Sequence, residues 1–308
     1  MTSVQSRLMT GTFLVAIATA ALFCFAPSGV SARQAAKIGK TFRDLADAPE
    51  MVVVPPGRFT MGSPATEEGR GPSEGPVHRV TVAKPFALGK YEVTKAQFAA
   101  FVAATGYVPH GDCGGTGASW RNPGLAQGDD HPAVCISALD AGAYADWLSV
   151  RTGQHYRLPS EAEFDYAARG KISGATNLLY WFGNAAADMC VNANGADQTD
   201  PKASIDGTVA PCRDGYVYTA PVGRFAANGF GLYDMAGNVW QWTADCENRD
   251  YANAPTDGSA DRSGVCQSGV LRGGSWRDSP RFLRAASRMG VGWFWGTNEY
   301  GFRVARDM

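Results

Sequence analysis

The apolar positions between Asn228 and Cys246 follow no single period, although the stretch is rich in large side chains. Apolar residues fall at Phe230, Leu232, Tyr233, Met235, Val239, Trp240 and Trp242. This spacing fits neither the face of an amphipathic helix nor the alternation of a half-buried strand. Glycines between the aromatic residues tolerate positive φ, so the backbone can turn sharply there. We therefore expect a buried, irregular scaffold at the centre of the fold.

Regular elements are predicted mainly in the first half of the chain. The segment 51–61 begins with a β-branched run, turns at Pro55-Pro56-Gly57 and resumes, which predicts a strand, a turn and a strand. The segment 78–91 predicts two short strands broken at Lys84-Pro85. Three capping boxes each open a helix that a glycine ends. The boxes are Thr94 with Gln97, Ser137 with Asp140 and Ser160 with Glu163, for helices over 95–104, 138 to about 152, and 161–169.

No long helical pattern follows Gly170, and short strands and loops are expected from there to the end. The chain shows no internal repeat, no low-complexity tract and no linker that would divide it. We predict one irregular α+β domain over 50–308 with little regular secondary structure.

The first 32 residues have the pattern of a secretory signal peptide. Arg7 supplies the positive charge, 9–25 is apolar, and Val30-Ser31-Ala32 offers a small-residue cleavage site. An uncleaved membrane anchor is the alternative, but the apolar run is short for a membrane span. We expect a periplasmic or secreted protein with no membrane span after cleavage, and a flexible lead-in over 33–49.

Composition and charge narrow the class of partner. The chain of 308 residues has a formal net charge of -1 and is 45% hydrophobic, which is typical of a globular protein with a sizeable core. It has no basic patch or polybasic run that would favour nucleic acid or an anionic membrane. We expect no nucleic-acid partner.

The cysteines predict disulfide bonds. One of the 7 cysteines lies in the signal peptide, and an even number remains in an exported chain. Many connectivities are open, and the three similar spacings favour the pairs Cys113–Cys135, Cys190–Cys212 and Cys246–Cys266. Closing each loop would stabilise the fold by about 3 kcal/mol. A zinc site would need C-x-x-C spacing, which the chain lacks.

Several motifs together resemble the formylglycine-generating enzyme, or sulfatase-modifying factor, family. They are PPGRFTMGS from Pro55, GKYEVTKAQFAAFV from Gly89, YRLPSEAEFDYAARG from Tyr156, YWFGN from Tyr180, APVGRFAANGFGLYDMAGNVWQWTADC from Ala220, VLRGGSW from Val270 and GFRVAR from Gly301. They cover nearly all of the chain after the signal peptide. The resemblance implies one compact domain related to C-type lectin folds.

The resemblance also implies calcium. The first site would comprise Asn192, the carbonyl of Ala193, Asp214 and the carbonyl of Tyr216, all of them oxygen ligands that suit calcium. The second would comprise Gly237, Val239 and Gln241. Many relatives have Glu in place of Gln241, so the loss of one negative charge predicts a weaker site. The alternative is that Asn192 and Asp214 only cap turns.

The catalytic cysteines of the resembled enzymes are missing. Their copper-binding pair falls on Asp278 and near Leu283 in this chain. A copper-thiolate site needs soft sulfur ligands, so we expect no copper site of that kind. Ser275 and Trp242 match positions that line the family's pocket, although both also suit purely structural roles. Ser275, Asp278 and Trp242 are therefore the pocket candidates.

Other branches of the resembled family also lack the cysteine pair, among them one that matures the pyoverdine chromophore. Iron stays open as an alternative metal, but the residues give it no support. The four histidines, His78, His110, His131 and His155, show no spacing typical of a metal site. Each of them is interpreted as a surface or core residue.

The tail carries three adjacent aromatic residues, Trp293, Phe294 and Trp295, which cannot all face inward. Some of them are predicted to line a groove that binds a sugar, peptide or aromatic ligand, with a packed loop as the alternative. Asp278 or Glu299 could shuttle protons nearby if burial raised the pKa of either carboxyl group.

Two functions follow as hypotheses. The first is an exported enzyme that modifies, by oxidation, a peptide or secondary metabolite without the copper-cysteine site. The second is a calcium-stabilised, lectin-like binding module for a peptide or glycan, or an envelope scaffold, without catalysis.

Overall fold

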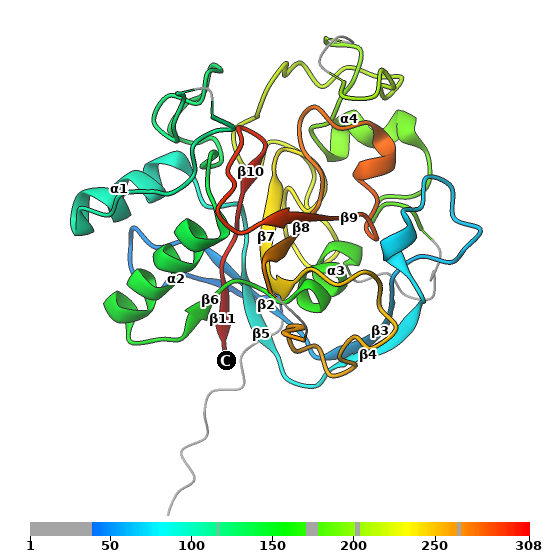
Figure 1. Cartoon of the computed structure of the whole chain (residues 1–308), viewed down its shortest axis with the longest axis horizontal. Coiled ribbons are helices and arrows are strands. Elements are labelled where there is room, and N and C mark those ends of the chain that lie inside the picture. The colour runs from blue at the N-terminus through cyan, green and yellow to red at the C-terminus, as the bar shows by residue number, and fades with distance from the viewer. Residues whose placement is uncertain (1–38, 116, 171–177, 201–203, 264–265) are drawn as a thin grey trace, which may run out of the picture. The chain divides into compact units, whose positions relative to one another are not determined.

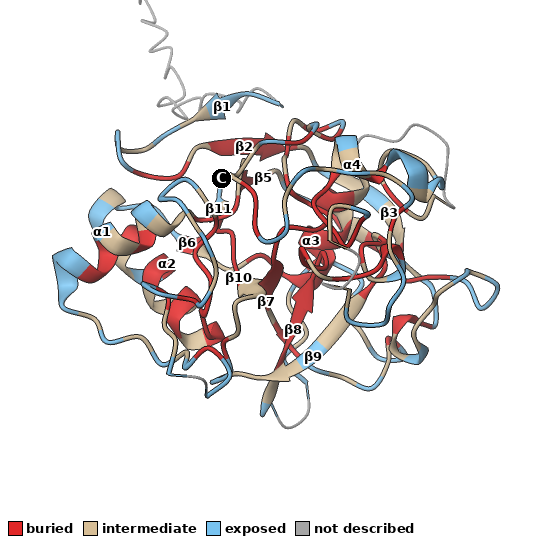
Figure 2. Ribbon diagram, turned by 90° about the horizontal axis from the view of Figure 1, so that it is seen from above, coloured by how far each residue is buried: buried red, intermediate tan, exposed pale blue. Residues whose placement is uncertain are grey.

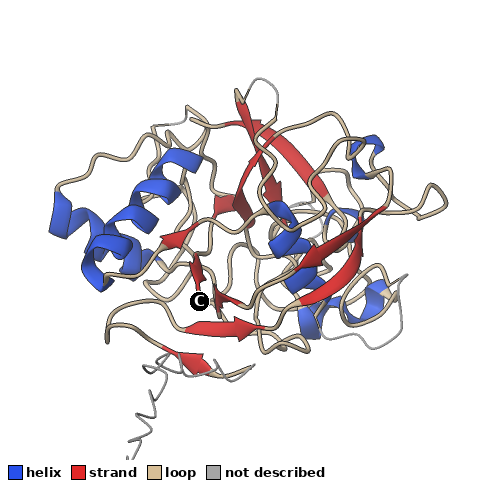
Figure 3. Cartoon of the chain, turned by 90° about the horizontal axis from the view of Figure 1, so that it is seen from below, coloured by secondary structure: helices blue, strands red, loops and turns tan. Residues whose placement is uncertain are grey.

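Short strands in three sheets and four helices are joined by long loops in the computed structural model (Figure 1). The structure describes residues 39–115, 117–170, 178–200, 204–263 and 266–308. The predicted signal peptide over 1–32 lies outside these residues. Figure 3 shows how much of the chain path is loop, which confirms the predicted α+β class with little regular structure.

The three capping boxes produce the three long helices at their predicted positions. The helices are α1 (Lys95–Thr105), α2 (Ala138–Thr152) and α3 (Glu161–Arg169). In each box the first side chain accepts a hydrogen bond from the third helical N–H, and the side chain there returns one to the capping residue. A single-turn helix, α4 (Met189–Asn192), follows a 3-10 turn. No helix in the described part of the chain is long and apolar enough to cross a membrane.

The first sheet has the order β1-β2-β5-β11-β6 and brings both ends of the described chain together. Its strands are β1 (Thr41–Phe42), β2 (Met51–Val54), β5 (Phe86–Gly89), β6 (Tyr156–Arg157) and β11 (Ala305–Asp307). A two-stranded sheet pairs β3 (Gly57–Met61) with β4 (His78–Val82). The predicted strands at 51–61 and 78–91 are thus confirmed, but β2 and β3 pair with different partners instead of with each other.

The expected lead-in over 33–49 is wrong for the part that the structure describes. Thr41 and Phe42 pair with β2, and Ala48 is buried. Residues 39–49 therefore belong to the domain, because the edge of β2 offers backbone groups that β1 satisfies.

The central sheet has the order β10-β7-β8-β9 and forms the middle of the molecule. Its strands are β7 (Trp240–Cys246), β8 (Ser268–Arg272), β9 (Arg288–Gly292) and β10 (Tyr300–Gly301). In Figure 2, β7 and β8 are largely buried, whereas β9 is mostly of intermediate exposure. The irregular stretch predicted from Asn228 to Cys246 is largely buried, and its last part is β7.

All three predicted disulfide pairs are formed in the structure. They join Cys113 to Cys135, Cys190 to Cys212, and Cys246 to Cys266. Each bond closes a short loop, so each stabilises its own region rather than linking distant parts of the chain.

Candidate functional site

A buried carboxylate lies at the position where the resembled enzymes carry their first cysteine. Asp278 Oδ2 accepts hydrogen bonds from the Trp240 indole Nε1 at 2.7 Å, from the Ser275 N–H at 2.9 Å and from the Ser275 hydroxyl at 2.6 Å. The side chain is almost fully buried. Burial raises the pKa of Asp278 above its ordinary value, although these three donors favour the charged form.

A second carboxyl group, Glu299, adjoins the first. It is more accessible than Asp278, forms an ion pair with Arg277 at 3.0 Å, and lies within hydrogen-bonding reach of the Ser275 hydroxyl. Burial raises the pKa of Glu299, the Arg277 guanidinium opposes this, and the charge of Asp278 adds to it. Two carboxyl groups with raised pKa values therefore meet at one serine hydroxyl.

The backbone around Ser275 is fixed by its own turn. The Asp278 N–H donates to the Ser275 carbonyl at 3.1 Å, and the Asp278 carbonyl accepts from the Ala196 N–H at 2.9 Å. Gly274 has a φ of +79°, and a Cβ there would come within 2.9 Å of the Phe282 carbonyl oxygen. The Gly-Gly-Ser turn thus needs glycine for its conformation and for the close approach of the next segment.

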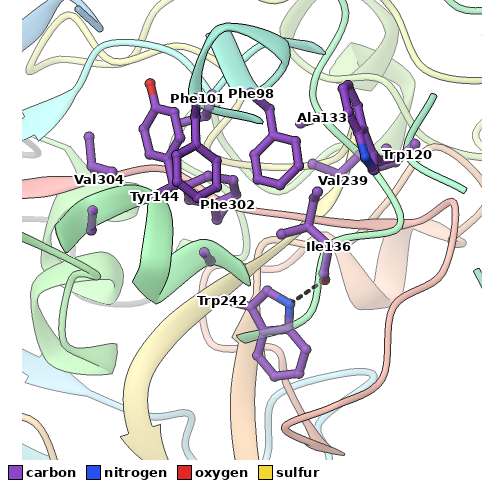
Figure 4. Packing of buried hydrophobic residues seen from close by; sticks show 14 of the residues in the cluster. Phe98, Phe101, Trp120, Ala133, Ile136, Tyr144, Val239, Trp242, Phe302 and Val304 are labelled. Atoms are coloured by element: carbon purple, nitrogen blue, oxygen red, sulfur yellow. Dashed lines mark hydrogen bonds between the residues drawn. The ribbon is translucent and has the colours of Figure 1, made fainter. Parts of the chain in front are cut away.

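Trp242 does not belong to this site, which corrects the sequence prediction. Its side chain is completely buried, and its indole N–H donates to the Ile136 carbonyl at 2.8 Å (Figure 4). Trp240, two residues earlier on β7, is the tryptophan that contacts Asp278. The sequence does not distinguish Trp240 from Trp242, because both residues stand in one apolar run and only the packing of β7 separates their surroundings.

The residues present do not fit a copper-thiolate centre. Leu283, near the second cysteine position, is buried in an apolar cluster, and the six cysteines that the structure describes are all bonded in pairs. None of these six is therefore free as a thiolate to bind a soft metal. Within the described residues, no group of three or more His, Cys, Asp or Glu side chains could hold a metal ion. The same finding gives an iron site no support.

Two side-chain oxygen atoms in the segments predicted to form the first calcium site lack hydrogen-bond donors. Asp214 Oδ2 is buried without a hydrogen-bond partner, and so is the side-chain oxygen of Asn194. Burial, with the charge of Asp197, raises the pKa of Asp214 to about 7. Asn192 is partly exposed, and its amide donates to the Asp188 carbonyl at 2.7 Å. Buried oxygen atoms without donors are what a calcium ion would satisfy, so Asp214 fits a cation and Asn194 fits better than Asn192.

Ala193 and Tyr216, the other two residues predicted for the first calcium site, take part there through backbone groups only. Ala193 is fully buried beside Asn194 and donates its N–H to the Met189 carbonyl at 2.7 Å. The Tyr216 N–H donates to Asp214 Oδ1 at 2.7 Å, which fixes the orientation of that carboxylate.

The second calcium position does not fit a cation. The side-chain oxygen of Gln241 accepts a hydrogen bond from Arg303, whose guanidinium is fully buried. Gly237 and Val239 are buried in the same region. A guanidinium already brings positive charge to the oxygen that would bind calcium, so Gln241 does not fit the role of calcium ligand predicted for it.

Comparison with known proteins decides the family. The family model described as "Sulfatase-modifying factor enzyme 1-like domain" matches residues 36–308. The chain belongs to the formylglycine-generating enzyme family. A formylglycine-generating enzyme of Mycobacterium tuberculosis is 33% identical over 84% of this chain and 98% of its own length. The mouse protein named inactive C-alpha-formylglycine-generating enzyme 2 is 32% identical over 84% of this chain and 86% of its own.

A solved structure agrees with this assignment. PvdO from Pseudomonas aeruginosa superposes with a TM-score of 0.72 and 37% identity, over 88% of this chain and 99% of that one. The relative named formylglycine-generating enzyme and the relative named inactive are almost equally similar to this chain, at 33% and 32% identity. Overall identity therefore does not distinguish an active member of the family from an inactive one.

Proposed function

We propose that this chain is an exported enzyme of the formylglycine-generating enzyme family that oxidises a peptide or secondary metabolite without a copper-cysteine site. The observation that carries the proposal is the pair of carboxyl groups, Asp278 and Glu299, beside Ser275, with Asp278 at the position where the resembled enzymes carry their first cysteine. Carboxyl groups with raised pKa values suit proton transfer near neutral pH.

In this proposal Glu299 contacts the substrate, and Asp278 exchanges protons with Glu299 through the Ser275 hydroxyl. Glu299 is partly accessible, and the partly exposed Arg277 beside it would hold an anionic or carbonyl group of the substrate. The buried Ser275 hydroxyl, bonded to Asp278, can pass a proton between the two carboxyl groups. The substrate would lose two hydrogens as protons and electrons, with dioxygen as the electron acceptor and hydrogen peroxide as its product.

We propose calcium as a structural partner of this site. Asn194 and Asp214 would hold it through the side-chain oxygens that lack donors. Ala196, two residues after Asn194, donates its N–H to the Asp278 carbonyl. An ion at Asn194 would thereby stabilise the segment that holds Asp278 in place.

Export to the periplasm or the medium is part of the proposal. Its supports are the signal-peptide pattern over 1–32 and the three disulfide bonds, which form and persist in oxidising compartments.

The alternative is a lectin-like binding module for a peptide or glycan, or an envelope scaffold, without catalysis. The exposed side chains of Phe294 and Trp295, 66% and 58% accessible, favour it because such rings commonly mark a binding surface.

The test compares the exported metabolites and peptides of strains that carry the wild-type gene, a deletion, Glu299→Gln or Asp278→Asn. We expect the deletion to accumulate a compound richer by two hydrogens, and each variant to slow its conversion by about 100-fold or more, since a general acid or base contributes at least this much. Mass spectrometry of culture supernatants measures the conversion.

Glu68→Gln is the matched control, because this exposed glutamate takes no part in the hydrogen bonds at Ser275. A deletion phenotype that both carboxyl variants rescue would reject the catalytic roles. A deletion without any metabolite change would favour the binding module.

A further inference from the structure

A cavity of about 660 Å³ lies apart from the carboxyl pair at Ser275. Its lining comes from the first half of α2, the segment 157–163, the middle of β7, the loop 258–262 and Trp293. None of Ser275, Asp278 and Glu299 takes part in this lining. The volume lies within the range of pockets that enclose small organic ligands.

The residues of α2 that line the cavity are mostly small, so they leave open space above the helix. Gly142 lies inside the helix, and a Cβ built on it would meet no heavy atom within 4 Å. Ala138, Ala143 and Ala145 continue the same lining. Glycine is unfavourable in a helix interior, and no packing contact requires it at position 142. The open space above Gly142 therefore belongs to the cavity.

The polar groups inside the cavity already have partners. Arg157 donates to both oxygens of Glu163 at 2.7 and 2.8 Å, and the Ser160 hydroxyl donates to the Gly258 carbonyl at 2.7 Å. The Thr243 hydroxyl likewise donates to the Val270 carbonyl at 2.9 Å. The interior thus offers a ligand mainly apolar contact.

Trp293 supplies the aromatic ring of the lining. Its carbonyl accepts the Ala138 N–H at 3.1 Å, which joins the tail to the start of α2. Its indole Nε1 is buried and has no partner among the described residues. Of the three adjacent aromatic residues in the tail, Trp293 is the one that borders a cavity.

Two exposed residues of opposite charge complete the lining. Asp146 and Arg262 form no ion pair with any residue that the structure describes. The cavity thus combines an aromatic ring, apolar walls, one unpaired acid and one unpaired base. A ligand with complementary groups would fit it. Such a ligand has a planar ring at one end and both an ammonium and a carboxylate group at the other.

We infer that this cavity binds a small zwitterionic aromatic compound, an aromatic amino acid or a close derivative of one. The ring packs against Trp293 and the glycine-alanine face of α2. The carboxylate pairs with Arg262 and the ammonium with Asp146.

The test titrates the purified, disulfide-bonded protein with L-tryptophan, indole, indole-3-acetate, tryptamine and N-acetyltryptophan amide by calorimetry. L-Tryptophan should bind at least 10-fold more tightly than any of the others. Equal binding of indole and L-tryptophan would overturn the assigned charges. Preference for N-acetyltryptophan amide would mean that the cavity accepts a peptide side chain, which contradicts the proposal, as does the absence of binding.

Gly142→Leu fills the space above the helix and should weaken L-tryptophan binding at least 10-fold. Leucine favours a helix more than glycine does, so the melting temperature should not fall. Val150→Leu, at an exposed position of the same helix, is the matched control and should leave affinity unchanged. Retained binding in Gly142→Leu would reject the site.

Arg262→Gln and Asp146→Asn should each remove the preference for L-tryptophan over indole. Asp278→Asn should bind L-tryptophan as the wild type does, so this inference and the proposed oxidation can fail separately.

Discussion

Buried carboxyl groups differ in charge according to which side chains face them. Burial alone would raise the pKa of Glu161, but the guanidinium groups of Arg288 and Arg272 lower it. Asp245 receives backbone N–H groups from Glu161 at 2.6 Å and Asp261 at 2.7 Å, without a guanidinium in direct contact. Burial, with the charge of Glu161, therefore raises the pKa of Asp245 to about 8.

This raised pKa predicts lower stability at alkaline pH. The folded value lies above the ordinary 3.8, so the contribution of Asp245 is complete below that value and is lost as the pH rises through about 8. We expect the free energy of unfolding to fall by on the order of 1 kcal/mol between pH 7 and pH 9 from this group. Urea unfolding at several pH values measures it.

Asp245→Asn should flatten this pH dependence even if it lowers stability overall, since the amide cannot titrate. The exposed Asp257→Asn, as a control, should keep the wild-type slope. A slope that is the same in Asp245→Asn and wild type would show that another group titrates.

At the scale of elements, local sequence signals fix some segments of the chain, and contacts between distant residues fix the others. The helices begin and end at their capping boxes and glycines, because those interactions lie within one turn. The loop 190–212 has no such signal, and the bond between Cys190 and Cys212 holds it closed. This loop carries Asn194 at one end and leads to Asp214 at the other.

Replacing Cys190 and Cys212 together by serine should lower the free energy of unfolding by about 3 kcal/mol, because the unfolded chain regains the freedom of that loop. Urea unfolding without reductant measures the loss. The exposed Ser263→Ala is a neutral control, and under full reduction the double variant and wild type should converge. A double variant as stable as the oxidised wild type would contradict this account.

At the scale of the whole molecule, the tail closes the fold. β11 lies between β5 and β6 in the first sheet, and Arg303 next to it donates to the carbonyls of Gly89 and Asp234 at 2.8 and 2.9 Å. Contacts across such distances in sequence join sheets that would otherwise be connected only by loops. Calcium at Asn194 and Asp214 would add a link of the same kind.

Calcium should therefore raise the melting temperature of the entire domain, and removal by EGTA should lower it. A concentration 100 times the dissociation constant corresponds to about 2.7 kcal/mol. Asn194→Ala should abolish the calcium-dependent shift, whereas Asn192→Ala should retain it, because only Asn194 has a buried oxygen without a donor. Scanning calorimetry with and without calcium measures both.

If both variants lost the calcium-dependent shift of the melting temperature equally, Asn192 would also be a calcium ligand, as the sequence predicted. A wild-type protein that shows no shift with calcium would reject the ion at this position.

The candidate site was predictable in part. Ser275, Asp278 and Glu299 were found because they stand beside a recognisable Gly-Gly-Ser motif or in the tail. Trp240 was not, because its neighbour Trp242 has the same residue type on the same strand. Arg303 was not, because its role depends on the strand order around Gln241.

The sequence by itself determined the α+β class, the helix ends and the family, and it favoured the disulfide pairs that form, since each rests on residues close in sequence or on ordered motifs. The tertiary structure decided which tryptophan contacts Asp278, that Arg303 donates to the side-chain oxygen of Gln241, and that α2 borders a cavity above Gly142. These features depend on how distant segments pack, and packing brings together residues that no local pattern relates.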